Sequence, residues 1–138
     1  MSDSTFNQNN NCLCDSNKTF EKCCGRFLNG SANAKTPKQL MRSRYTAYAL
    51  GNHGEYLLAT WLPEYVKEIT AESLSEKTQQ WVKLELLNNQ QKANEGMVEF
   101  NAYYKNDDGS ISVFHEESTF HRIDGRWYYV NGEVETNA

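Results

Sequence analysis

Four cysteines lie close together near the start of this 138-residue chain, and the sequence contains no other cysteine. They follow the pattern C-x-C, eight residues, C-C, and are Cys12, Cys14, Cys23 and Cys24. Three kinds of chemistry use such a group: a pair of disulfides, a thiol redox centre, or a metal site bound by thiolates. The spacing of the cysteines and the character of their neighbours favour the metal site.

Disulfide bonds fit this spacing poorly. A bridge between adjacent cysteines, or between cysteines two positions apart, is strained because bridged Cα atoms normally lie about 4.4–6.8 Å apart with a specific torsion. Cross-bridges such as Cys12–Cys23 are geometrically possible, but they need an oxidising compartment, and the polar N-terminal residues lack the pattern of a secretory signal. A redox centre usually has C-x-x-C at the start of a helix in a βαβ unit, and the sequence lacks this pattern.

Four thiolates within thirteen positions suit a tetrahedral Zn²⁺ site, and iron can occupy the same ligands. The segment has few large apolar residues, so a metal is expected to hold it folded; binding supplies roughly 10–16 kcal/mol to such modules. Because protein ligands would fill all four positions, we expect a structural metal without a hydrolytic role. The flanking basic residues either offset the charge of the thiolates or contact an acidic partner surface or an RNA backbone. They are Lys18, Lys22 and Arg26.

A carboxylate on a predicted strand is the second candidate site. In the run "ISVFHEESTFHRI", alternate positions place one set of side chains on the same face, namely Ser112, Phe114, Glu116, Ser118 and Phe120. If this face points inward, Glu116 is either an acid–base group in a pocket or the partner of a structural salt bridge to Arg42 or Arg44 on the first helix. The salt bridge is the favoured interpretation.

Helix signals fill the first half of the chain. The sequence "TPKQ" at residues 36–39 is a helix start, with a threonine N-cap, a proline at the first helical position and a glutamine at the capping-box position. This helix is expected to run to about Leu50 and to end at Gly51. A second helix is expected at about 54–61, and a short third helix at around 71–77.

From Trp81 onward the apolar pattern changes to a period of two, which predicts strands. In the first strand, Val82, Leu84 and Leu86 are expected to share one face. Three further strands follow, separated by turn signals at 106–110 and at Asp124-Gly125. Helices followed by a four-stranded antiparallel meander predict an α+β domain with the helices against one face of the sheet.

The charge of the chain is uneven. Residues 1–44 carry a net charge of +4 and the remaining residues carry −8, within a total of −4. An acidic body argues against specific DNA binding. The longest apolar run, at residues 56–62, is far shorter than the roughly 20 residues of a membrane helix, so we expect no membrane insertion and a cytoplasmic protein.

The cysteine segment, "CLCDSNKTFEKCC", resembles the SEC-C motif, which is best known from the C-terminal tail of the SecA protein-translocation motor. Ser16, Lys18 and Phe20 match the usual interior of the motif. Asp15 stands where a glycine normally precedes the serine, and Cys24 stands where the motor has a histidine.

Further matches extend the resemblance to the YchJ (UPF0225) family of small bacterial proteins. They are "LMRSRYTAY" at 40–48, "TWLP" at 60–63, the pattern Glu116-x-Ser118-x-Phe120, and "WYYVNG" at 127–132. That family joins an N-terminal SEC-C motif to a cone-shaped domain like nuclear transport factor 2, with a curved antiparallel sheet around its helices. Together with composition, the resemblance implies a disordered N-terminus at 1–10, a zinc-binding SEC-C module at 11–30 and an α+β cone at 36–134. Cone domains commonly pair through their sheets, so a homodimer is one expected assembly.

The resemblance implies a cytosolic metal-binding adaptor more than an enzyme. In the motor tail, the SEC-C module contacts an export chaperone and the ribosome. By analogy, the basic segment here is expected to bind a protein or ribosomal partner in secretion or protein quality control. The alternative is a small-molecule-binding or isomerase-like cone with a pocket near Glu116, surrounded by Arg42, Arg44, Tyr45 and Ser118.

Overall fold

The computed structural model describes residues 11–14, 16–77 and 79–137. The helices come first: η1 Phe20–Lys22, α1 Gly25–Leu28, α2 Pro37–Leu50, α3 Gly54–Ala59, η2 Pro63–Tyr65 and α4 Ala71–Leu74. The strands follow: β1 Gln80–Lys92, β2 Glu95–Lys105, β3 Ile111–Ile123 and β4 Arg126–Asn137. This order confirms the predicted α+β class. The predicted disordered segment, residues 1–10, lies outside the described residues.

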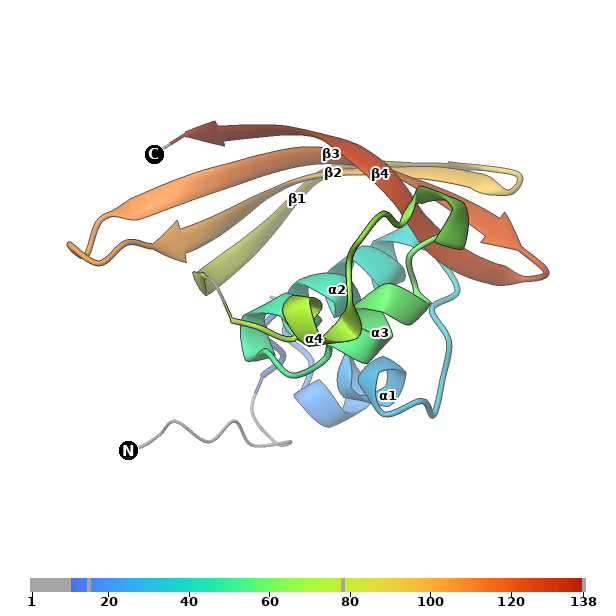
Figure 1. Ribbon diagram of the computed structural model, residues 1–138, viewed down its shortest axis with the longest axis horizontal. Helices are drawn as coiled ribbons and strands as arrows, with labels where there is room; N and C mark the ends of the chain where they lie inside the picture. The colour runs from blue at the N-terminus through green and yellow to red at the C-terminus, as the bar shows by residue number, and fades with distance from the viewer. Residues whose placement is uncertain (1–10, 15, 78, 138) are drawn as a thin grey trace.

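The four strands form one antiparallel sheet in the order β1-β2-β3-β4, so the predicted meander is confirmed. The sheet curves over the helices, which all lie on one side of it (Figure 1). Its inner face contains the buried side chains of β2 and β3, which alternate with more exposed ones as expected; they are Val98, Phe100, Ala102, Ser112, Glu116, Ser118 and Phe120.

Strand β1 departs from the predicted alternation. A bulge lies between Trp81 and Lys83, so Trp81 pairs with Tyr104. Val82 is 48% exposed, whereas Leu84 is buried. The expectation that Val82 shares the inner face is therefore wrong: an extra residue in the bulge shifts the alternation by one position and turns the Trp81 side chain inward. The strand also continues beyond its apolar part, to Lys92.

Helix α2 has the predicted limits because its end signals are local. The Thr36 side chain accepts a hydrogen bond from Gln39 N (3.1 Å), and Gln39 Oε1 accepts one from Lys35 N (2.8 Å). Gly51 ends the helix with a φ of +76°, which glycine adopts readily. The helix lies between two layers: it packs on β1, β2 and β4 on one side and on α1 on the other (Figure 1). It can therefore present side chains to both.

The later helices are shorter than predicted, at residues 54–59 and 71–74, and they touch closely. A Cβ atom added at Gly54 would lie 1.7 Å from the Ala71 carbonyl oxygen and 2.5 Å from Ser75 Oγ. Gly54 N also donates a hydrogen bond to Ser75 Oγ (2.8 Å). Glycine thus permits the contact between α3 and α4. No helix in the described part of the chain is long and apolar enough to cross a membrane.

This contact leads to a first prediction. Gly54→Ala is expected to lower the free energy of unfolding by about 1–3 kcal/mol, because α4 must move away, even though alanine favours helix. Urea denaturation measures the change. Glu55→Ala, at the exposed next position of α3, is the control and should stay within about 0.5 kcal/mol of the unchanged protein. Equal stability of the two variants would show that α3 and α4 do not pack as described.

Candidate metal centre and a cavity under the sheet

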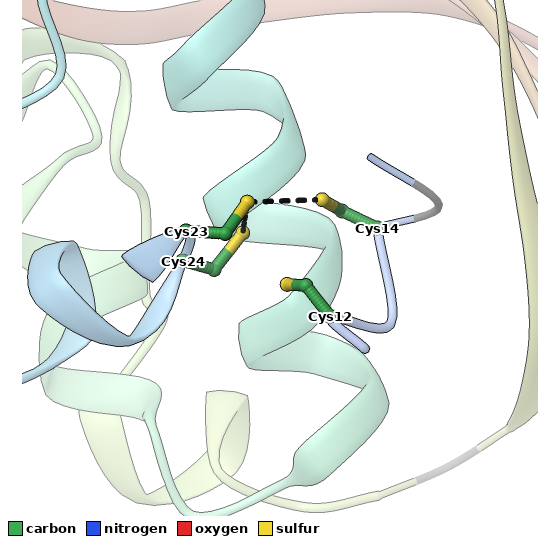
Figure 2. Close-up of side chains that lie close together, drawn as sticks. All are labelled: Cys12, Cys14, Cys23 and Cys24. Carbon is green, nitrogen blue, oxygen red and sulfur yellow. Dashed lines mark hydrogen bonds between the residues drawn. The ribbon is translucent and has the colours of Figure 1, made fainter. Parts of the chain in front are cut away.

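The four cysteines come together from two short loops beside α2 (Figure 2). Cys12 and Cys14 lie on a turn that is closed by a hydrogen bond from Cys12 N to the Lys18 carbonyl oxygen (2.8 Å). Cys23 and Cys24 follow η1 and lead into α1. The two pairs, separated in sequence, therefore face each other across a small space.

Their sulfur atoms have the arrangement of a metal site. All four Sγ atoms lie within 4.8 Å of one another, with Cys14 and Cys23 3.6 Å apart and Cys23 and Cys24 3.9 Å apart. The cysteines are free, since a disulfide would bring two sulfurs to about 2.05 Å. Four thiolates at about 2.3 Å from a tetrahedral metal would be separated by about 3.8 Å. The donor set and its spacing fit a metal ion bound by four thiolates.

The thiols cannot all ionise without such a cation, because they are buried against one another. Hydrogen bonding with Cys12 lowers the pKa of Cys14 to about 6 and also lowers the pKa of Cys23. A hydrogen bond with Cys14 raises the pKa of Cys12, and a hydrogen bond with Cys12 raises the pKa of Cys24. Cys12 and Cys24, whose pKa values are raised, keep their protons. A divalent cation would replace these protons, so metal binding should release them.

Helix α2 supplies polar groups around the sulfurs. Thr46 Oγ1 donates a hydrogen bond to Cys24 Sγ (3.3 Å) and lies 3.7 Å from Cys12 Sγ. Arg42 Nη1 donates to the Cys14 carbonyl oxygen (2.5 Å) and lies 3.7 Å from Cys14 Sγ. The sequence pattern predicts Arg42 or Arg44 beside Glu116 and contains no signal for Thr46. The structure places Arg42 at the cysteines instead, because residues four apart lie on the same side of a helix, and this side faces the cysteine loops.

The cysteine segment also shares its apolar packing with the rest of the protein. Phe20 and Phe27 are buried, and with the cysteines they belong to the same buried cluster as Leu40 and Tyr45 of α2. The candidate metal centre is therefore packed onto α2 rather than held apart on a linker.

A cleft of about 540 Å³ lies beside the cysteines and is lined by positively charged side chains, which are Lys18, Arg26, Lys38 and Arg42. Arg26 donates from Nε to the Cys23 carbonyl oxygen (3.1 Å), and its guanidinium lies 4.6 Å from the centre of the Phe27 ring. Lys18 and Lys22 are exposed, although Lys22 does not line the cleft. Lys38 was not predicted from the sequence, since only the fold brings the start of α2 to the cysteine loops.

A second hollow, a cavity of about 260 Å³, lies between α2 and the inner face of the sheet. Arg44 and Tyr45 from α2 and Glu116 from β3 line it, so the structure brings these three predicted residues together. Ser118, which was predicted for the same pocket, is buried and donates a hydrogen bond to Glu116 Oε2 (2.5 Å).

The prediction of a salt bridge between Glu116 and an arginine of α2 is wrong. No ion pair within the residues that the structure describes joins Glu116 to Arg44 or to Arg42. Arg44 Nη1 instead donates to the Leu57 carbonyl oxygen and to Thr60 Oγ1, both at 2.7 Å. The two charges are linked through a residue that sequence reasoning missed, Tyr129.

Tyr129 lies between the two charged side chains. Its hydroxyl donates to Glu116 Oε2 (2.9 Å), and its ring centre lies 4.7 Å from the Arg44 guanidinium carbon. Burial raises the pKa of Tyr129, which keeps its hydroxyl protonated as a donor, and burial lowers the pKa of Arg44. Arginine nevertheless stays charged in proteins. The wall of the cavity thus contains one positive and one negative charge.

Comparisons with known proteins agree with this architecture. A family model described as "YchJ, middle NTF2-like domain" matches residues 36–132. A UPF0225 protein of Vibrio parahaemolyticus is 40% identical over 124 residues, which cover 88% of this chain and 73% of the relative. One from Streptomyces coelicolor is 40% identical over 125 residues, covering 88% of this chain and 94% of the relative.

A solved structure is similar along most of the chain. The solution structure of a SEC-C motif containing protein from Rhodopseudomonas palustris has a TM-score of 0.81 and 35% sequence identity with this chain. The match covers 90% of this chain and 98% of the other, so it includes both the helical part and the sheet.

Proposed function

Because this chain belongs to the YchJ (UPF0225) family, with a SEC-C motif and an NTF2-like domain, we propose that it is a cytosolic zinc-binding adaptor. The four thiolates would hold the zinc, and because they fill a tetrahedral shell, the metal has a structural role. A bound zinc would fix the two cysteine loops relative to each other and to α2. Those loops form one wall of the basic cleft.

The observation that carries the proposed adaptor role is the position of this cleft. Its four cations come from the cysteine segment and from α2, so the metal and the helix together set their spacing. The remainder of the chain is acidic, which makes the cleft the place where a negatively charged partner is attracted. Arg26 presents a planar donor group that suits carboxylates and phosphates. We propose an acidic segment of a protein in secretion or protein quality control as the partner, with ribosomal RNA as the competing possibility.

Charge reversal tests this proposal. The double variant Arg26→Glu/Lys38→Glu is expected to weaken binding of a fluorescent polyglutamate peptide roughly tenfold or more, because both changes put like charges in the cleft. Fluorescence anisotropy at low and physiological salt measures the affinity, which should fall with salt. Lys105→Glu is the control: Lys105 is exposed at the β2–β3 hairpin, and binding should change less than about twofold.

The same assay separates the two kinds of partner. A single-stranded RNA of equal charge that binds more tightly than the peptide, and that loses affinity in the double variant, would favour the ribosomal partner. Equal losses in the double variant and in Lys105→Glu would show that binding follows overall charge, and would contradict a role for the cleft.

A second candidate function is small-molecule binding, and the cavity beside Glu116 favours it. The cavity is concave, has aromatic walls and contains a few converging polar groups, as ligand sites usually do. Isomerase chemistry is less well supported, because among the described residues Glu116 is the sole carboxylate that lines the cavity, and no histidine or lysine lines it to form an acid–base pair. We therefore propose binding at this site, not catalysis.

A further inference from the structure

The cavity between α2 and the sheet has aromatic walls that are not fully covered. Trp81 packs edge-on against Phe114, with ring centres 5.9 Å apart, and Trp61 packs in the same way against Tyr129 at 5.3 Å. These four side chains are only partly buried, although neighbouring inner-face positions such as Phe100 are buried. The cavity thus leaves aromatic surface open to solvent, and covering that surface with an apolar ligand would be favourable.

The volume of the cavity limits the size of the ligand. The cavity, of about 260 Å³, lies just below the range of roughly 300–1,000 Å³ that is typical of pockets for drug-sized ligands, so its ligand must be small. One substituted ring or two fused rings would fill this space.

The charges in the wall indicate an uncharged ligand. Arg44 and Glu116 contribute one positive and one negative charge, and Tyr129 contacts both. The charges in the cavity wall therefore balance each other without a ligand. A charged molecule would add a charge in a partly dehydrated site with no partner left to compensate for it, which is costly.

Glu116 determines which polar group the ligand needs. The hydrogen bonds from Ser118 and Tyr129 both end on Oε2, so Oε1 keeps its capacity to accept. Every fully buried side-chain nitrogen and oxygen in the described part of the chain has a hydrogen-bond partner, which indicates that Oε1 is not sealed from solvent. A carboxylate only accepts hydrogen bonds, so a ligand that removes this solvent must donate one in its place.

From these steps we infer that the cavity binds a small uncharged aromatic molecule that donates an N–H or O–H hydrogen bond to Glu116. This inference rests on the proposed small-molecule-binding function and adds the class of ligand. Trp61, Trp81 and Phe114 cover the ring, and Glu116 selects for the donor.

Indole and benzofuran test the inference as a matched pair, because they have the same size and shape and differ in the ring N–H, which benzofuran replaces with oxygen. Each compound is titrated into the isotope-labelled, metal-loaded protein. The side-chain Nε1–H signals of the protein's three tryptophans are followed by NMR. Trp61 and Trp81 line the cavity, whereas Trp127 is buried elsewhere, with Nε1 donating to the Lys35 carbonyl oxygen (3.2 Å). Indole is expected to shift the first two signals but not the third, and to bind roughly tenfold more tightly than benzofuran.

Two variants and one control locate the site. Ala102 lines the cavity, so Ala102→Leu should weaken binding of indole roughly tenfold by filling the space, whereas Ala59→Leu, the same change at an exposed position of α3, should not. Glu116→Gln should remove the preference for indole over benzofuran. The comparison of the two probes on the unchanged protein remains decisive if either variant fails to fold.

The possible failures are distinguishable. Equal affinity for indole and benzofuran, with shifts at Trp61 and Trp81, would overturn the requirement for a donor and leave the small-molecule function standing. If neither probe shifts a tryptophan signal at millimolar concentration, both the donor requirement and the small-molecule function are overturned. Shifts of Trp127 instead of Trp81, or unchanged binding in a folded Ala102→Leu, would place the site outside this cavity and overturn the inference.

Discussion

Cys24→Ser is expected to release the metal and to unfold the cysteine segment, lowering the free energy of unfolding by at least about 3 kcal/mol. Metal binding contributes roughly 10–16 kcal/mol to isolated zinc modules, while a typical domain is stable by only about 5–15 kcal/mol. Cys24 is fully buried, and serine keeps the hydrogen-bonding capacity toward Thr46 at similar size. The decrease in the free energy of unfolding is therefore due to the missing thiolate more than to altered packing. Because Phe20 and Phe27 belong to the main buried cluster, destabilisation should extend to α2.

Elemental analysis and thermal unfolding measure this effect together. The unchanged protein should contain about one zinc per chain, and a strong chelator should lower its melting temperature toward that of Cys24→Ser without affecting the variant further. Thr46→Val is the matched control, because it removes a hydroxyl near the sulfurs but keeps four thiolates; it should retain metal with roughly 10–100-fold lower affinity. Four freely titrating thiols in a metal-free, equally stable protein would refute the site. Iron in place of zinc would change the identity of the metal only.

Arg44→Met is expected to lower the free energy of unfolding by about 2–5 kcal/mol. Methionine approximates the length of the side chain but leaves the Leu57 carbonyl oxygen and Thr60 Oγ1 without the guanidinium that binds both. It also leaves the buried Glu116 carboxylate without the nearby positive charge. Leu57 and Thr60 would lose their hydrogen bonds to α2. Chemical denaturation measures the change, with Arg126→Met as control: Arg126 lies 5.9 Å from the Tyr128 ring and is only partly buried.

A double-mutant cycle identifies the cause of this loss. If Arg44 and Glu116 interact through Tyr129, the double variant Arg44→Met/Glu116→Gln should lose about 0.5–3 kcal/mol less than the sum of the single variants. Strict additivity would mean that Arg44 acts only through the Leu57 and Thr60 contacts. A loss in Arg44→Met no greater than that in Arg126→Met would contradict its structural role.

Features set by neighbouring residues could be predicted from the sequence. The limits of α2 follow from a cap within residues 36–39 and from Gly51, and the inward set on β3 follows from strict alternation. The cluster of four cysteines could be predicted because their spacing is itself local. The bulge at Val82 could not be predicted, because it depends on how β1 pairs with β2.

The assignment of side chains to the two sites was harder, for a reason that lies in α2. Arg42 and Arg44 are two positions apart, which places them on different sides of a helix, and either could have faced Glu116. Only the packing of the cysteine loops on one side and of the sheet on the other assigns Arg42 to the sulfurs and Arg44 to the cavity. Tyr129 and Lys38 were missed because their roles come from contacts made across the fold.

The position of α2 between the cysteine loops and the sheet also affects the order in which the protein can fold during synthesis. All four thiolates, together with Arg42 and Thr46, lie before Gly51, whereas the first strand begins at Gln80. A growing chain therefore contains all residues of the candidate metal centre before it contains any of the sheet. Metal capture can order the cysteine loops and α2 first, because chains generally fold from the N-terminus as they emerge. The side of α2 that later contacts the sheet is then available for β1, β2 and β4 to pack on.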